Sequence, residues 1–82
     1  MSKDDFKEMT ILEQGMIVMQ EGNHLTQVKK GDYLLNLYSV GDFFVEVYYS
    51  LIKNEIEKID VITDLSRIDL YIDEKMNPKS IS

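Results

Sequence analysis

Three consecutive stretches of aromatic and β-branched residues occupy the middle of the chain and constrain its fold more than any other feature. They cover residues 33–38, 42–49 and 56–62. Side chains of these types prefer the half-buried surface of a β-sheet. The connections between the stretches are long enough for hairpin turns only, so we expect three consecutive antiparallel strands.

The hairpin loops determine which side chains share a face of this sheet. Residues 52–54 fit a three-residue loop that ends on Asn54, a residue type that tolerates left-handed backbone. Residues 40–42 fit a second three-residue loop. The expected cross-strand partners are Leu35 with Val47, Leu37 with Val45, Val45 with Val61, Val47 with Ile59 and Tyr49 with Glu57. Because side chains alternate along a strand, both loops predict one apolar inner face: Leu35, Leu37, Phe43, Val45, Val47, Tyr49, Ile59 and Val61.

The N-terminal part of the chain has weaker patterns. Asp5 is a candidate N-cap with Glu8 three residues later, and apolar residues follow at helical spacing, so a helix is expected over residues 5–14. The short apolar run at 16–19 and the alternating segment at 24–28 predict two short strands, with a turn at residues 21–23.

A second helix is predicted after the third strand. Asp64 can cap it, and Leu65, Ile68, Tyr71 and Ile72 follow at helical spacing up to a stop at residues 77–78. Alternation at residues 68, 70 and 72 leaves a strand as the competing interpretation. The predicted fold class is α+β: an antiparallel β-meander of three to five strands flanked by a short N-terminal and a short C-terminal helix. We expect a single domain over residues 1–77 and a disordered tail at 78–82.

Composition narrows the classes of partner and compartment. Fifteen acidic residues against nine basic ones give a net charge of −6, which opposes binding to a nucleic-acid backbone. No apolar run approaches the roughly 20 residues of a membrane helix, and the first residues are acidic where a signal peptide is basic. With no cysteine in the chain, disulfides and thiolate metal sites are excluded. We therefore expect a cytoplasmic protein that binds neither nucleic acid nor membrane.

The centre of the chain resembles a family of short uncharacterised bacterial proteins of the Bacteroidetes type. The resemblance covers residues 33–72 and rests on Leu37-Tyr38 followed, after a short gap, by the run Phe-Phe-Val-Glu-Val-Tyr-Tyr at 43–49. A Leu-x-x-Tyr-Leu pattern in the family's C-terminal helix corresponds to Ile68, Tyr71 and Ile72. The chain lacks the proline that often precedes that tyrosine. The resemblance implies a tyrosine- and valine-rich hairpin, a further strand and a short helix, and it implies no activity.

Residues able to carry out catalysis are scarce. His24 is the single histidine, and beside the predicted turn it is interpreted as a solvent-exposed residue rather than a catalytic base or zinc ligand. The four glycines are too far apart to form a phosphate-binding loop, and the carboxylates do not follow calcium-loop spacing. We therefore expect no enzyme activity, no metal and no cofactor.

The predicted outer face of the meander is the candidate binding surface. It carries an aromatic stripe of Tyr38, Phe44 and Tyr48, with Glu46 diagonal to Lys58 as a cross-strand ion pair. Exposed aromatic residues are typical of protein-binding surfaces. The leading hypothesis is a small non-enzymatic interaction module that binds a protein partner or a second copy of itself. Two alternatives stay open: residues 16–28 bury this face as core, or the face lines a small-molecule site of a binding domain or enzyme subunit.

Overall fold

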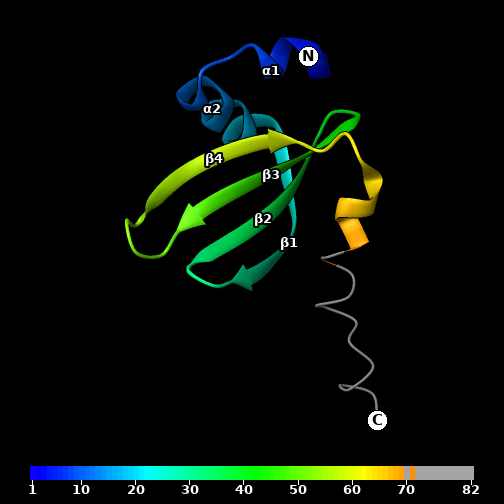
Figure 1. Ribbon diagram of the computed structural model, residues 1–82. Coiled ribbons are helices and arrows are strands. Elements are labelled where there is room, and N and C mark those ends of the chain that lie inside the picture. Colours follow the sequence, from blue (N-terminus) through cyan, green and yellow to red (C-terminus); the bar gives the residue numbers. More distant parts are fainter. Residues whose placement is uncertain (70, 72–82) are drawn as a thin grey trace.

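The computed structural model describes residues 1–69 and 71 and shows a four-stranded antiparallel sheet preceded by two short helices (Figure 1). The strands are paired in the order β1-β2-β3-β4, so the sheet is a meander whose edges are β1 and β4. The predicted α+β class and antiparallel meander are confirmed. The elements are α1 (Lys3–Lys7), α2 (Ile11–Glu21), β1 (Gly22–Lys30), β2 (Tyr33–Val40), β3 (Phe43–Ser50), β4 (Glu55–Val61) and the 3₁₀ turn η1 (Leu65–Arg67).

The N-terminal region forms two helices where one helix and a strand are expected. Ser2 caps α1, and Thr10 begins α2 through a capping box in which the Thr10 hydroxyl accepts from the Glu13 amide and the Glu13 carboxylate accepts from the Thr10 amide. The predicted helix over residues 5–14 is therefore wrong in its bounds. Residues 16–19 lie within α2, so the strand predicted there is also wrong, whereas residues 24–28 lie in β1 as expected.

Two Gly-Asp turns connect the first three strands. Lys30 pairs with Tyr33 and Val40 pairs with Phe43, which leaves two-residue loops at residues 31–32 and 41–42. Gly31 and Gly41 have φ angles of 60° and 57°, a left-handed conformation that glycine adopts at the first position of such hairpin turns. The three-residue loop predicted at 40–42 is therefore wrong by one residue.

This one-residue difference places every side chain of β2 on the face opposite to the predicted one, relative to β3. Leu37 pairs with Glu46 and Leu35 with Tyr48, in place of the predicted Val45 and Val47. Directly paired residues share a face in an antiparallel sheet. The predicted inner face therefore divides, with Leu35 and Leu37 on the side opposite to the valines of β3.

The second hairpin agrees with the prediction except at its turn. Val45 pairs with Val61 and Val47 with Ile59, as expected. The register shifts beyond Tyr48, so Tyr49 pairs with Ile56 instead of the predicted Glu57. The loop has four residues, 51–54, and Asn54 has the expected left-handed φ of 59°.

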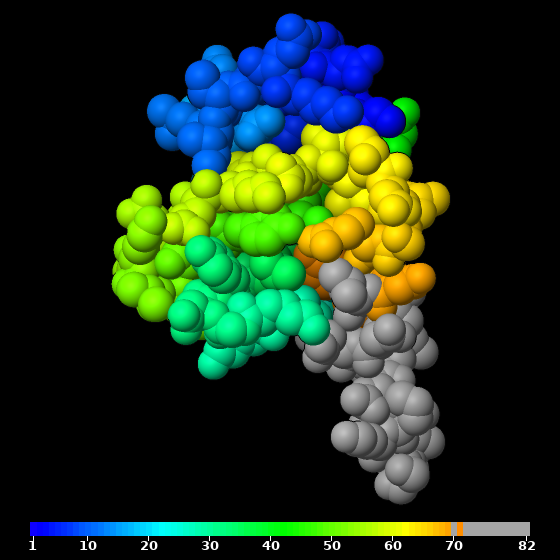
Figure 2. Space-filling model, in the orientation of Figure 1, coloured from blue at the N-terminus to red at the C-terminus, as the bar shows by residue number. Residues whose placement is uncertain are grey.

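Each face of the sheet carries its own apolar core. The helix-side core joins Phe6 of α1 and Val18 of α2 to sheet residues Val40, Phe43, Val45, Val47 and Ile59. The opposite core joins Val28, Leu35 and Leu37 to Ile62 and Tyr71 in the segment after β4. Figure 2 shows the N-terminal residues in blue and the orange residues just before position 70 at separate places on the surface. The sheet is thus the middle layer between the helices and the C-terminal segment.

The chain after β4 turns at the predicted cap. The Asp64 carboxylate accepts from the Ser66 amide at 3.0 Å, and η1 follows. The Ile62 amide donates to the Phe44 carbonyl at 2.9 Å, which keeps this segment beside β3. Residues 70 and 72–77 of the predicted C-terminal helix, which include Ile72, and the predicted tail at 78–82 lie outside the described residues.

Candidate functional site

An apolar groove lies between α2 and the helix side of the sheet. Its volume is about 340 Å³. Tyr38 is the only residue of its lining with a hydroxyl, amide or charged side chain. We call this site the α2 groove, and it is lined by Ile11, Leu12, Gly15, Met16, Val18, Met19, Tyr38, Val47, Ile56 and Ile59.

The outer wall of the α2 groove is an exposed apolar stripe on α2. Leu12, Met16 and Met19 recur at helical spacing i, i+4 and i+7, so they share one side of the helix. Leu12 is 74% exposed and Met19 is 86% exposed. A helix normally turns its apolar stripe toward the core, but the buried residues of α2 are Gln14 and Val18. The stripe therefore faces solvent in the single chain.

A polar anchor explains this orientation of α2. The buried Gln14 side chain donates from Nε2 to the Phe6 carbonyl at 2.9 Å, which ties α2 to the last turn of α1. The Phe6 ring is fully buried and packs on the Phe43 ring at a centroid distance of 5.6 Å. Gln14 and Phe6 thus fix the helix pair over one end of the sheet and leave the Leu12–Met16–Met19 stripe exposed beside the α2 groove.

The sheet is too wide for α2 to cover. Four strands at about 4.8 Å spacing span roughly 15 Å between the outer strand axes, whereas one helix with its side chains is about 10–12 Å across. Next to α2, Ile56 of the edge strand β4 is 43% exposed. The α2 groove therefore lies where α2 leaves the helix side of the sheet uncovered.

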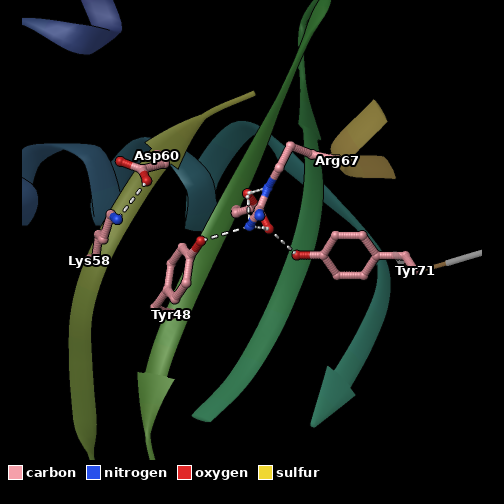
Figure 3. A network of polar contacts seen from close by, with 6 residues as sticks. Tyr48, Lys58, Asp60, Arg67 and Tyr71 are labelled. Carbon is pink, nitrogen blue, oxygen red and sulfur yellow. Dashed lines mark hydrogen bonds and ion pairs between the residues drawn. The ribbon is translucent and has the colours of Figure 1, made fainter. Parts of the chain in front are cut away.

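The opposite face of the sheet holds a buried carboxylate. Glu46 is only 2% exposed. The Arg67 guanidinium donates from Nη2 to both of its oxygens, at 3.0 and 2.9 Å, and from Nε to Oε1 at 3.2 Å. The Tyr71 hydroxyl donates to Oε2 at 2.8 Å. We call these residues, together with Tyr48, the Glu46 cluster (Figure 3).

The electrostatics of the Glu46 cluster are those of a closed network. Arg67 Nη2 also donates to the Tyr48 hydroxyl at 2.9 Å, which joins β3 to the segment after β4. Burial, followed by the hydrogen bond to Glu46, raises the pKa of Tyr71 far above its usual value. The hydrogen bond to Glu46 likewise raises the pKa of Arg67. Both oxygens of the carboxylate are occupied by donors, so the cluster serves to hold residues 62–69 and 71 against the sheet.

Lys58 lies beside the Glu46 cluster and makes a different ion pair from the one predicted. Its ammonium contacts the Asp60 carboxylate at 3.1 Å and lies 5.0 Å from the centre of the Tyr48 ring. Lys58 pairs across the strands with Tyr48, while Glu46 pairs with Asp60. The predicted ion pair between Glu46 and Lys58 is wrong because Arg67, 21 residues away in sequence, takes the carboxylate.

The predicted aromatic stripe is divided between the two faces. Tyr38 lies on the helix side and lines the α2 groove, because the two-residue turn pairs it with Val45. Phe44 and Tyr48 are partly buried in the opposite core. The predicted outer face is thus partly covered, but by Ile62, Ile68 and Tyr71 and not by residues 16–28.

Sequence reasoning missed the α2 groove and the Glu46 cluster for different reasons. The capping box Thr10-x-x-Glu13 can be recognised in the sequence, and it indicates a helix that includes Met16 and Met19. The Glu46 cluster has no local signal, since its members come together only through the register of β3 and the turn at Asp64.

His24 lies in β1 and not in a turn. Its Nε2 is 3.0 Å from the Asn36 Oδ1, which also accepts a hydrogen bond from Gln27 Nε2 at 2.8 Å. The His24 and Tyr38 rings pack in a T-shaped arrangement with their centroids 5.0 Å apart.

Within residues 1–69 and 71, no three His, Asp or Glu side chains come together as a metal site requires. None of the helices in this part of the chain has the length and apolarity to cross a membrane.

Comparisons with protein-family models, with curated proteins and with solved structures found no match to this chain.

Proposed function

We propose that this chain is a small, non-enzymatic protein-interaction module and that the α2 groove is its contact surface. The observation that carries the proposal is the exposed stripe of Leu12, Met16 and Met19 beside exposed Ile56. Contiguous apolar surface on a small protein marks a place where another molecule binds. Methionine is enriched at protein interfaces because its flexible side chain adapts to a partner.

The proposed contact surface therefore differs from the aromatic face that was predicted from the sequence. Of the predicted anchors, Tyr38 contributes to the α2 groove. Glu46 and Tyr48 are engaged in holding the C-terminal segment. Non-enzymatic action is supported by the Glu46 cluster, whose carboxylate has both oxygens occupied by donors and thus offers no free base.

A small-molecule site is the second candidate, because the volume of the α2 groove lies within the range of ligand pockets. Such sites fix their ligand with a few convergent polar groups, and here Tyr38 alone offers one. This lining suits an extended apolar protein surface better than an oriented ligand.

The experiment is affinity purification with the tagged wild type and two variants that each add one carboxylate. Met16→Glu places the charge inside the α2 groove, and Ile52→Glu places it on the exposed loop between β3 and β4, where the side chain is 76% exposed. The proposal expects every stable assembly, with itself or another protein, to be lost with Met16→Glu and kept with Ile52→Glu. Identical assemblies from both variants contradict it.

A further inference from the structure

Two methionines of this chain lie exposed on one side of α2. The sequence has five methionines and no cysteine, so reversible oxidation of sulfur can occur only at methionine. Met16 is 52% exposed and Met19 is 86% exposed, whereas Met9 packs against the helix-side core. Because exposure governs how easily an oxidant reaches a sulfur atom, we expect Met19 to react fastest, Met16 next and Met9 most slowly.

The reaction adds one oxygen atom to each sulfur. A lone pair of the thioether sulfur attacks one oxygen of hydrogen peroxide, so that an S–O bond forms and the O–O bond breaks. The proton of the transferred oxygen passes to the departing hydroxide, which leaves as water. The sulfur is oxidised and the peroxide is reduced by the same electron pair. The product, methionine sulfoxide, is polar, and methionine sulfoxide reductases convert it back to methionine.

A sulfoxide at these positions changes the chemistry of the α2 groove. Met16 and Met19 line the groove, and Tyr38 is the only polar side chain of the lining. A sulfoxide oxygen is a hydrogen-bond acceptor, and burying such a group without a donor is costly. The oxygen therefore keeps water in the groove and opposes contact with an apolar surface.

The anchoring of α2 does not depend on either methionine. The buried residues of this helix are Gln14 and Val18, and the Gln14 side chain donates to the Phe6 carbonyl. Neither Met16 nor Met19 belongs to the buried residues of the helix-side core. Oxidation of a buried methionine disrupts a core, whereas oxidation at these two exposed positions should change the surface and leave the fold intact.

We propose that Met16 and Met19 form a reversible oxidation site, at which a peroxide converts the α2 groove from an apolar into a polar surface. This inference rests on the proposed function, because it gives that contact surface a redox regulation.

The first test measures where the protein is oxidised. The full chain is treated with hydrogen peroxide, samples are taken over time, and tandem mass spectrometry of its peptides locates each sulfoxide. We expect oxidation to be severalfold faster at Met19 than at Met9, with Met16 between them, and the circular dichroism spectrum to stay unchanged. Equal rates at Met9 and Met19, or loss of the helical signal as Met16 and Met19 react, overturns the inference.

The second test measures the apolar surface without any partner, by retention on a hydrophobic-interaction column. Retention of the wild type should fall on oxidation. It should recover after treatment with methionine sulfoxide reductases and dithiothreitol, a dithiol that becomes a disulfide while the sulfoxide oxygen leaves as water. The double variant Met16→Leu with Met19→Leu is the matched control. Its groove stays apolar, while Met1, which is also 52% exposed but lies outside the α2 groove, still oxidises. Equal falls in the wild type and the double variant overturn the inference.

Affinity purification with the oxidised protein separates this inference from the proposed function. A wild type whose retention falls on oxidation while all its assemblies persist retains the oxidation site and rejects the proposed function. Assemblies that are lost with Met16→Glu but survive oxidation of Met16 and Met19 retain the proposed function and reject the redox regulation.

Discussion

Replacing Arg67 by methionine should destabilise the fold strongly, although Arg67 lies partly at the surface. The side chain of Arg67 is 41% exposed, but its partner Glu46 is almost completely buried. Methionine keeps much of the arginine's apolar length and removes the charge. In the variant the buried Glu46 carboxylate keeps the hydrogen bond from the Tyr71 hydroxyl and loses the hydrogen bonds from the guanidinium.

The size of the loss follows from the burial of the two partners. Removing one member of a buried ion pair costs about 3–5 kcal/mol. The exposure of Arg67 reduces this figure, since water can enter the vacated space and the remaining hydroxyl still donates. We expect a loss of about 2–3 kcal/mol, a large share of the roughly 5–10 kcal/mol typical of a small domain.

Urea denaturation followed by circular dichroism measures this loss. With a slope of about 1 kcal/mol per molar urea for a small chain, the midpoint should fall by about 2–3 M. The double variant Arg67→Met with Glu46→Gln should recover about 1 kcal/mol, because it no longer buries an unpaired charge. Lys58→Met is the matched control and should change the midpoint little, since Lys58 and Asp60 are both well exposed.

Two outcomes would refute this reasoning. A midpoint for Arg67→Met within about 0.5 M of the wild type, which corresponds to about 0.5 kcal/mol, would mean that the ion pair does not hold residues 62–69 and 71 on the sheet. A double variant less stable than Arg67→Met alone would mean that the loss reflects packing and not the buried charge.

Three further predictions concern the turns, caps and tyrosines. Thr10→Ala should cost about 1 kcal/mol in thermal or urea unfolding through loss of the α2 cap, and an unchanged midpoint would contradict the capping box. Gly22→Ala should cost about 1–2 kcal/mol, because its Cβ would lie 2.5 Å from the Val18 carbonyl oxygen, and a gain in stability would contradict the tight junction. The pKa of Tyr71 is raised in the folded protein, mainly by burial. Ionisation of Tyr71 should therefore leave the free energy of unfolding unchanged below pH 10.0, the ordinary pKa of tyrosine, and lower it as the pH rises above that value. Tyr71→Phe should weaken this alkaline loss in pH-dependent unfolding, and an identical pH profile would count against the buried hydroxyl bond to Glu46.

The strands were predictable because their signal is local. The residues of β2, β3 and β4 have side chains that favour strands, and Asn54 indicates its own left-handed turn. The Val45–Val61 and Val47–Ile59 pairs were predicted correctly although the loop has four residues, 51–54, because the register shift between Tyr48 and Tyr49 offsets the extra residue. Within the described residues, agreement is thus best where a few neighbours decide the conformation.

The register of β2 was not predictable by the same reasoning. A two-residue turn at residues 41–42 and a three-residue turn at 40–42 both give an apolar face, because β2 has apolar side chains on both sides of the sheet. Alternation cannot distinguish faces when both are covered. The Gly-Asp pair at 31–32 has the same form as the pair at 41–42, and that repetition is the sequence feature that indicates two-residue turns.

The run Met16 to Met19 shows why the α2 groove was missed. Four apolar residues in a row fit a strand or a helix equally well by periodicity. The capping box six residues earlier indicates a helix, and on a helix the two methionines lie on one side with Leu12. The exposure of that side depends on the contact of Gln14 with Phe6, which no sequence pattern specifies.

The contact surface at the α2 groove is tested most directly by NMR, through the amide spectrum of ¹⁵N-labelled protein recorded at several concentrations and with a captured protein partner added. We predict shifts for Leu12, Met16 and Met19 of α2 and for Ile56 of β4, either as the concentration rises or when a protein captured by the tagged chain is added, with the amides of β1 unchanged. Shifts confined to β1 or to residues around Phe44, or a spectrum that does not change at any concentration while Met16→Glu leaves all partner binding intact, would contradict it.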